Sequence, residues 1–305
     1  MKRIFLLSVC LITAVVSWGK KDRFPGEDIK HFTLPIEYVS DPGSNGLTGP
    51  EEEKRPNVFA NVTKAEMTVY LPAVEEPVSC VILFPGGGYD AVQIDHVGLP
   101  GAEFFTSHGI AAVSVKYRLP NGHIMVPITD GQQAIRMVRQ HAEEWNIIPD
   151  RIGILGSSAG GHLASMLAVH WVAAVPDSEK KLERYTSRPD FVILLKAAIN
   201  WSRGHTMSNS HGPDPTEETI HFCNALNYIN DRHMPTFIAH CSDDPAAPAA
   251  GTVNYFLKLR ELGIPAELHV FDHGGHGIGF GKKNRPMDQW MDALLAWKYL
   301  YPDKK

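Results

Sequence analysis

A serine flanked by glycines is the first feature of the sequence that could carry chemistry. Residues 156–160 read Gly-Ser-Ser-Ala-Gly, a G-x-S-x-G motif centred on Ser158. An apolar run, 151–155, precedes the motif and a small, apolar run, 159–171, follows it, which predicts a strand, a tight turn and a helix. Side chains two residues either side of such a turn would collide, which explains the glycines. The turn exposes the Ser158 hydroxyl and aims the Ala159 amide at a reacting carbonyl oxygen.

The motif has two other possible interpretations. Centring the turn on Ser157 would require glycine at Leu155 and at Ala159, so Ser157 is rejected as the nucleophile. A glycine-rich turn with a capping serine would explain the motif without any chemistry. Two further motifs favour the chemical interpretation.

A glycine loop follows the strongest early strand of the sequence. Residues 84–89 read Phe-Pro-Gly-Gly-Gly-Tyr, directly after the apolar run 78–84. Consecutive glycines let the main chain approach a ligand and point its amides at an oxyanion, as in loops of the HGGG type, although Pro85 stands in place of the histidine. No Gly-Lys-Ser/Thr follows, and no G-x-G-x-x-G pattern can be drawn, which excludes a nucleotide loop.

Two segments of the last third of the chain could activate the serine. Residues 240–248 read His-Cys-Ser-Asp-Asp-Pro-Ala-Ala-Pro, and residues 271–279 read Phe-Asp-His-Gly-Gly-His-Gly-Ile-Gly. A serine hydroxyl needs an imidazole as general base, and the imidazole needs a carboxylate to fix its tautomer. The chain order serine, aspartate, histidine is the order of the α/β-hydrolase fold.

Each of these segments contains two candidates for its catalytic role. The base is His276 or His273, and His276 is favoured because the glycines around it indicate the tip of a loop. The acid is Asp243 or Asp244, which the residues alone do not separate. Asp272 is interpreted as a local turn acceptor at the end of a strand.

Regularly spaced apolar runs predict the elements that must position these residues. Strands are predicted at 67–71, 78–84, 110–117, 151–155, 191–198, 236–241 and 266–271. Helices are predicted at 128–145, 159–171, 250–262 and 287–300. Alternating strands and helices predict an α/β fold with a mostly parallel central sheet flanked by helices, and function at the carboxyl ends of the strands.

The overall composition fits one large α/β domain. The chain has 305 residues, of which 44% are hydrophobic and 21% charged. The net charge of −5 is spread along the chain without a basic patch interleaved with aromatics, so nucleic acid is not an expected partner. The histidines at 205, 211 and 221 lack a recognisable ligand spacing, so no metal and no cofactor are expected. Cys80 and Cys241 fall in predicted buried strands, where free thiols are favoured over a disulfide.

Three regions are expected along the chain. Residues 1–19 resemble a secretory signal peptide, because Lys2-Arg3 precede an apolar segment, 4–16, that is too short for an ordinary membrane span. A secreted or periplasmic protein without stable membrane insertion follows from that interpretation. Residues 20–65, rich in proline, glycine and charge, are expected to form an exposed N-terminal arm, and residues 66–305 the catalytic domain. Within that domain, 201–234 is either a lid or a surface excursion.

The chain resembles the α/β-hydrolase superfamily, and within it the bacterial acetyl-xylan esterase and feruloyl-esterase-like group. The resemblance runs from about residue 61 to residue 301 and includes the strings PGGGY, DHVG, AAVSVKYRLP, IGILGSSAGGHLAS, DDPAAP and GIPAELHVFDHGGHGIG. It implies Ser158 as nucleophile, His276 as base and Asp244 as acid, since the aspartate of that group is followed by three residues and a proline. It also implies oxyanion donors at Gly87 and Gly88, beside the Ala159 amide.

The sequence departs from the pattern of that group at three places. Val97 stands where a glutamate is usual, and Ala247 where a valine is usual. Residues 196–200 read Lys-Ala-Ala-Ile-Asn where the group has Tyr-Pro-Val-Ile-Ser, which bears on the acyl or sugar pocket.

The motifs and the N-terminal segment predict a secreted serine hydrolase that works through a Ser-His-Asp triad and an acyl-enzyme. The resemblance implies an esterase that removes short acyl groups, acetyl first, from carbohydrate such as xylan. A peptidase of the prolyl-oligopeptidase type is an alternative that the missing propeller disfavours. A catalytically silent hydrolase fold that serves as a binding module is a second alternative, disfavoured by the intact serine, aspartate and histidine.

Overall fold

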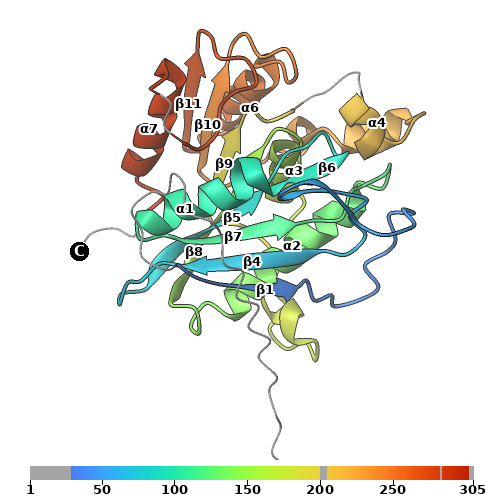
Figure 1. Ribbon diagram of the computed structural model, residues 1–305, viewed down its shortest axis with the longest axis vertical. Helices are drawn as coiled ribbons and strands as arrows, with labels where there is room; N and C mark the ends of the chain where they lie inside the picture. The colour runs from blue at the N-terminus through green and yellow to red at the C-terminus, as the bar shows by residue number, and fades with distance from the viewer. Residues whose placement is uncertain (1–28, 200–204, 282–283, 302–305) are drawn as a thin grey trace, which may run out of the picture.

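A computed structural model of the chain describes residues 29–199, 205–281 and 284–301. Its centre is an eight-stranded sheet with the order β1-β4-β7-β5-β8-β9-β10-β11 (Figure 1). The strands in this order span Lys30–Pro35, Glu66–Leu71, Ala111–Lys116, Val78–Phe84, Ile147–Ser157, Val192–Leu195, Thr236–Cys241 and Ala266–Phe271. The pairs β1–β4 and β4–β7 are antiparallel, and the other neighbours are parallel. The predicted mostly parallel sheet is thereby confirmed.

Helices cover both faces of this sheet. α2 (Met125–Gln140), α3 (Ala159–Val169) and α6 (Ala250–Glu261) contribute to one hydrophobic cluster, whereas α1 (Leu99–Ser107) and α7 (Trp290–Ala296) contribute to a second. Within β5 the side chains alternate between the two clusters, so that Ile82 faces the first, and Val81 and Leu83 face the second. This three-layer arrangement explains why β5 is apolar at consecutive positions.

The N-terminal segment differs from the expected exposed arm. Residues 30–35 form β1, which pairs along its length with β4 at the edge of the central sheet. Its alternate residues Phe32 and Leu34 pack against the core, which explains the pairing. The sequence analysis does not predict β1, because its alternation of apolar and polar residues is short and is followed by a segment rich in proline and glycine. Residues 1–19, where the signal peptide is expected, lie outside the described residues.

Residues 36–65 of this segment are also fixed to the domain. β2 (Glu52–Arg55), β3 (Val58–Ala60) and β6 (Ala91–Gln93) form a separate three-stranded sheet. Asn45 is buried, and its side-chain amide donates to the carbonyls of Val62 and Leu119. The Arg118 guanidinium, ion-paired with Asp130, donates to the carbonyl of Gly43. These hydrogen bonds place the segment against the loop that follows β7.

Several short elements complete the structure. A π-helical turn at Ile94–Gly98 leads into α1, which the sequence analysis had not predicted, and 3-10 turns span Lys181–Arg184 and Pro286–Gln289. The described part of the segment 201–234 holds α4 (His205–His211), α5 (Glu217–Phe222) and a 3-10 turn at Ala225–Asn227. Their place after β9 puts them at the carboxyl edge of the sheet (Figure 1).

The cysteines in the described part of the chain are free. Cys80, Cys223 and Cys241 are all buried and unpaired, as expected for Cys80 and Cys241. None of the helices within the described ranges is both long enough and apolar enough to cross a membrane.

Candidate active site

Ser158 occupies a strained turn between β8 and α3. Its backbone has φ 57° and ψ −120°, a region that non-glycine residues rarely adopt. A Cβ on Gly156 would lie 2.1 Å from the carbonyl oxygen of Gly160, and a Cβ on Gly160 would lie 2.0 Å from that of Phe84. The glycines of the motif are therefore required by backbone contacts, as the sequence analysis predicts. The neighbouring Ser157 ends β8 and is buried.

The glycine loop lies directly against this turn. A Cβ on Gly86 would lie 2.8 Å from the carbonyl oxygen of Ser157 and 2.9 Å from the Cβ of Ser158. The carbonyl of Gly87 accepts hydrogen bonds from the amides of Asp90 and Ala91, and that of Gly86 accepts from the amide of Gln93. In a planar trans peptide the N–H points opposite to the C=O, so the amides of Gly87 and Gly88 project away from that segment. The amides of Gly87, Gly88 and Ala159 stay the predicted oxyanion donors.

The imidazole of His276 joins the serine to a carboxylate. His276 Nε2 lies 2.8 Å from Ser158 Oγ, and His276 Nδ1 lies 2.6 Å from Asp244 Oδ2. The three residues come from the loops after β8, β10 and β11, all at the carboxyl edge of the sheet. The structure thus brings together the serine, aspartate and histidine that the sequence analysis singles out.

The carboxylate of Asp244 is held on both oxygens. Its Oδ1 accepts the amides of Ala246 (2.9 Å) and Ala247 (3.0 Å), and its Oδ2 lies 3.3 Å from His240 Nε2 as well as beside His276. Burial raises the pKa of the Asp244 carboxyl, but the hydrogen bonds from His240, His276 and Ala247 lower that pKa by more, so it lies well below its usual value. The side chain is therefore a buried carboxylate anion, suited to stabilising a protonated His276.

The two alternative residues lie elsewhere. His273 is exposed, and its Nδ1 lies 3.2 Å from Asp272 Oδ2. Asp243 accepts hydrogen bonds from the amides of Gly274 (3.2 Å) and Gly275 (2.7 Å). These amide hydrogen bonds hold the pKa of the Asp243 carboxyl below its ordinary value. Asp243 therefore fixes the loop that carries His276 and makes no contact with the imidazole.

Lys196 and Arg285 donate hydrogen bonds to backbone carbonyls of the same loop. The side chain of Lys196 is almost fully buried, and its Nζ donates to the carbonyl of His276 over 2.9 Å. Burial lowers the pKa of the Lys196 ammonium to about 8. Arg285, ion-paired with Asp288 at 2.8 Å, donates to the carbonyl of Gly277 over 3.4 Å. The sequence analysis relates the stretch 196–200 to the acyl or sugar pocket, and in the structure the Lys196 ammonium contacts the loop that carries His276.

A buried hydrogen-bond chain runs behind the glycine loop. The hydroxyl of Tyr89 lies 2.8 Å from His162 Nδ1, and His162 Nε2 lies 2.7 Å from the carbonyl of Cys223. Because a carbonyl only accepts, Nε2 carries the proton of a neutral imidazole and Nδ1 accepts from Tyr89. His233 has a similar setting, between the carbonyl of Met234 and the hydroxyl of Tyr255.

These two histidines predict a loss of stability in mild acid. Burial lowers the pKa of His162 and of His233 to about 4, from an ordinary value of 6.5. The unfolded chain then binds more protons than the folded chain between pH 6.5 and 4, so the free energy of unfolding falls as the pH falls through that window, by about 3 kcal/mol for each histidine. We expect urea denaturation midpoints to decrease steeply from pH 7 to pH 4.5. A His233→Gln variant should show a shallower decrease, and an unaltered slope would contradict this assignment.

No group of three side chains able to hold a metal ion converges anywhere in the ranges that the structure describes. His211 stacks on His162 with ring centroids 6.3 Å apart, and His221 lies 3.3 Å from the Tyr228 hydroxyl. These two histidines therefore have partners of other kinds.

The sheet order, the strand–turn–helix at Ser158 and the later loops that carry Asp244 and His276 define an α/β hydrolase. Within that class the chain belongs to the BD-FAE family, whose model matches residues 67–259. The resemblance to this superfamily found in the sequence is thereby confirmed.

Two curated relatives come from bacteria. The chain is 32% identical to the acetylxylan esterase of Xylanibacter ruminicola, over 79% of this chain and 49% of the relative. It is 30% identical to endo-1,4-beta-xylanase B of Butyrivibrio fibrisolvens, over 79% of this chain and 39% of the relative. The chain thus spans half or less of the length of these two proteins.

Solved structures give the same fold. An acetyl ester-xyloside bifunctional hydrolase from Caldicellulosiruptor lactoaceticus superposes with a TM-score of 0.75 at 29% identity, covering 87% of this chain and 94% of the other. The propionate-bound esterase Est2 of Thermogutta terrifontis superposes with a TM-score of 0.66 at 23% identity, covering 92% of this chain and 97% of the other. At this identity the second structure supports the fold alone.

Proposed function

We propose that the protein is a serine esterase that hydrolyses short acyl esters, acetyl first, on carbohydrate. The observation that carries the proposal is the continuous chain from Ser158 Oγ through His276 to the buried carboxylate of Asp244, with distances of 2.8 and 2.6 Å. A hydroxyl with a general base and a buried anion behind that base is the arrangement that acyl transfer requires.

The first half of the proposed reaction forms an acyl-enzyme. Ser158 Oγ attacks the ester carbonyl carbon while its proton passes to His276 Nε2. The electron pair of the C=O bond moves onto the carbonyl oxygen, where the amides of Gly87, Gly88 and Ala159 stabilise the negative charge. The tetrahedral intermediate collapses by breaking the bond to the sugar oxygen, which leaves as an alcohol with the proton from His276.

The second half repeats these steps with water. His276 Nε2 takes a proton from a water molecule, whose oxygen attacks the acyl carbon and forms a second oxyanion at the same amides. Collapse of this intermediate breaks the bond to Ser158 Oγ, which recovers its proton from His276. The products are the free carboxylic acid and the original enzyme.

The carbohydrate part of the proposal rests on relatives. One curated relative is named an acetylxylan esterase, another an endo-1,4-beta-xylanase, and a structural neighbour is named an acetyl ester-xyloside bifunctional hydrolase. We therefore propose acetylated xylan as the first substrate to test. We also propose export from the cytoplasm, on the sequence of residues 1–19.

A labelling experiment combined with a substrate comparison tests this function. A fluorophosphonate probe should label the protein, and peptide mass spectrometry should locate the label on Ser158. If Ser158 were not labelled, the chain would be a catalytically silent binding module. Acetate release from acetylated xylan should then greatly exceed cleavage of a proline-linked peptide. The reverse preference would replace the esterase by a peptidase of the prolyl-oligopeptidase type.

A further inference from the structure

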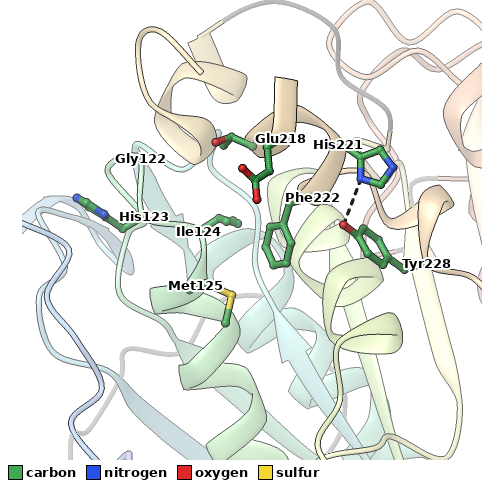
Figure 2. Close-up of a pocket in the computed structure, with 9 residues that line it drawn as sticks. Gly122, His123, Ile124, Met125, Glu218, His221, Phe222 and Tyr228 are labelled. Carbon is green, nitrogen blue, oxygen red and sulfur yellow. Dashed lines mark hydrogen bonds between the residues drawn. The ribbon is translucent and has the colours of Figure 1, made fainter. Parts of the chain in front are cut away.

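A pocket separate from the serine opens beside α5. It has a volume of about 600 Å³. Figure 2 shows the side chains that line it. Its walls come from the loop before α2 and from the segment after β9, and are formed by Gly122, His123, Ile124, Met125, Glu218, Thr219, His221, Phe222 and Tyr228. Ser158, Asp244 and His276 are not among these residues. The pocket can therefore hold only a part of a substrate that does not react.

An aromatic corner forms one side of this pocket. The rings of Phe222 and Tyr228 lie 6.1 Å apart at an interplanar angle of 67°. His170 supports both, stacking on Phe222 at 4.7 Å and contacting Tyr228 at 4.6 Å. Phe222 thus stacks on the imidazole of His170 and also lines the pocket (Figure 2). The corner is thus held in place before any ligand arrives.

Polar groups and an exposed apolar side chain form the remaining rim. The carboxylate of Glu218 points into the pocket above Phe222, and the imidazole of His221 lies beside it (Figure 2). Met125 is 50% exposed on the opposite side. Apolar and aromatic walls with a few convergent polar groups are typical of sites for small organic ligands.

The pocket is joined to the proposed oxyanion loop through a single residue. The backbone carbonyl of Asn209 accepts the amide of Gly122, at the pocket rim, over 2.7 Å. The side-chain amide of the same Asn209 donates to the carbonyl of Gly88 over 3.0 Å. On its other side, Cys223, next to Phe222, accepts from His162 at the start of α3. Two hydrogen bonds of Asn209 therefore link the pocket rim to the loop at Gly86–Gly88, which lies against Ser158.

We propose that this pocket binds a pyranose unit of the carbohydrate chain, next to the unit whose ester is cleaved. The proposal rests on the proposed function. The apolar C–H face of a pyranose fits the aromatic corner, and its rim of hydroxyls fits the carboxylate and the imidazole. An acyl chain fits less well, because it must begin at the serine and would meet a carboxylate.

Matched variants of two adjacent glutamates test the proposal. Glu218→Ala should lower kcat/KM for acetylated xylo-oligosaccharides about tenfold more than it lowers kcat/KM for p-nitrophenyl acetate, since a charge-assisted hydrogen bond to the distant sugar unit is lost. Glu217 is also exposed and lies on the same helix, but it does not line the pocket. Glu217→Ala should leave both substrates unaffected. Equal effects of Glu218→Ala on the two substrates would overturn the proposal.

A binding measurement separates this inference from the proposed reaction. Calorimetric titration of the Ser158→Ala variant with unacetylated xylo-oligosaccharide should give binding that Glu218→Ala, and also Phe222→Ala, weakens by about tenfold. Circular dichroism checks that each variant is folded. Absence of binding, or binding that both variants leave unchanged, would overturn the pocket assignment. Failure of the enzyme to cleave any ester, with this binding intact, would overturn the proposed function alone.

Discussion

Ser158→Ala is expected to lower kcat toward p-nitrophenyl acetate by at least about 1,000-fold while the protein remains folded. The hydroxyl is the group that bonds to the acyl carbon in the proposed reaction, and no other side chain can replace it. Its contacts are with the imidazole of His276 and not with the core. Alanine also tolerates the positive φ of 57° about as well as serine does, so little change in stability is expected. Kinetics and thermal melting of the same preparation measure both quantities.

Ser157→Ala is the matched control for this variant. Ser157 precedes the nucleophile by one residue, ends β8 and is buried, with only its backbone against the glycine loop. Its loss should change kcat by no more than a few fold. If Ser158→Ala kept a tenth of the wild-type rate, or if Ser157→Ala were the inactive variant, the assignment of the nucleophile would be wrong.

The sequence predicts those parts of the site that depend on local geometry. Gly156 has no room for a Cβ because the carbonyl oxygen of Gly160, in the same turn, lies against it, and the five-residue motif includes that requirement. Gly160 is confined instead by the carbonyls of Phe84 and Pro85 in the glycine loop, a contact that the motif does not show. The loop at Gly86–Gly88 is predictable for a similar reason, since it follows a strand that is apolar at consecutive positions. The parallel sheet follows from the same apolar runs.

The remaining parts depend on contacts between distant segments. Asp243 and Asp244 are adjacent in the sequence but have different partners. Asp243 faces the amides of Gly274 and Gly275, whereas Asp244 faces the imidazole of His276. The conformation of the folded turn determines which aspartate meets the imidazole. Lys196 contacts a carbonyl 80 residues further along the chain, and no local pattern records that contact. β1 was missed because its partner strand lies beyond a long segment rich in proline and glycine.

Asp244→Asn is expected to lower kcat by about 10,000-fold. The amides of Ala246 and Ala247 both donate to Oδ1, so the oxygen of the new carboxamide must stay at that position to satisfy them. The NH₂ group is then directed at His276 Nδ1, which must accept. A neutral imidazole that accepts at Nδ1 carries its proton on Nε2, and it can no longer take the proton of Ser158. The variant also lacks the negative charge that stabilises the protonated imidazole.

Asp243→Asn is the matched comparison, because it removes the charge of the neighbouring residue without touching the imidazole. An asparagine oxygen can still accept one of the two glycine amides, so the loop is weakened but not released, and a loss of about tenfold in kcat is expected. We would measure kcat with p-nitrophenyl acetate for both variants. The rate of fluorophosphonate labelling would report on attack by the serine, the acylation step. If Asp243→Asn cost as much activity as Asp244→Asn, or more, the acid of the triad would be Asp243. The hydrogen bond between Asp244 and His276 would then position the ring without supplying the charge that catalysis needs.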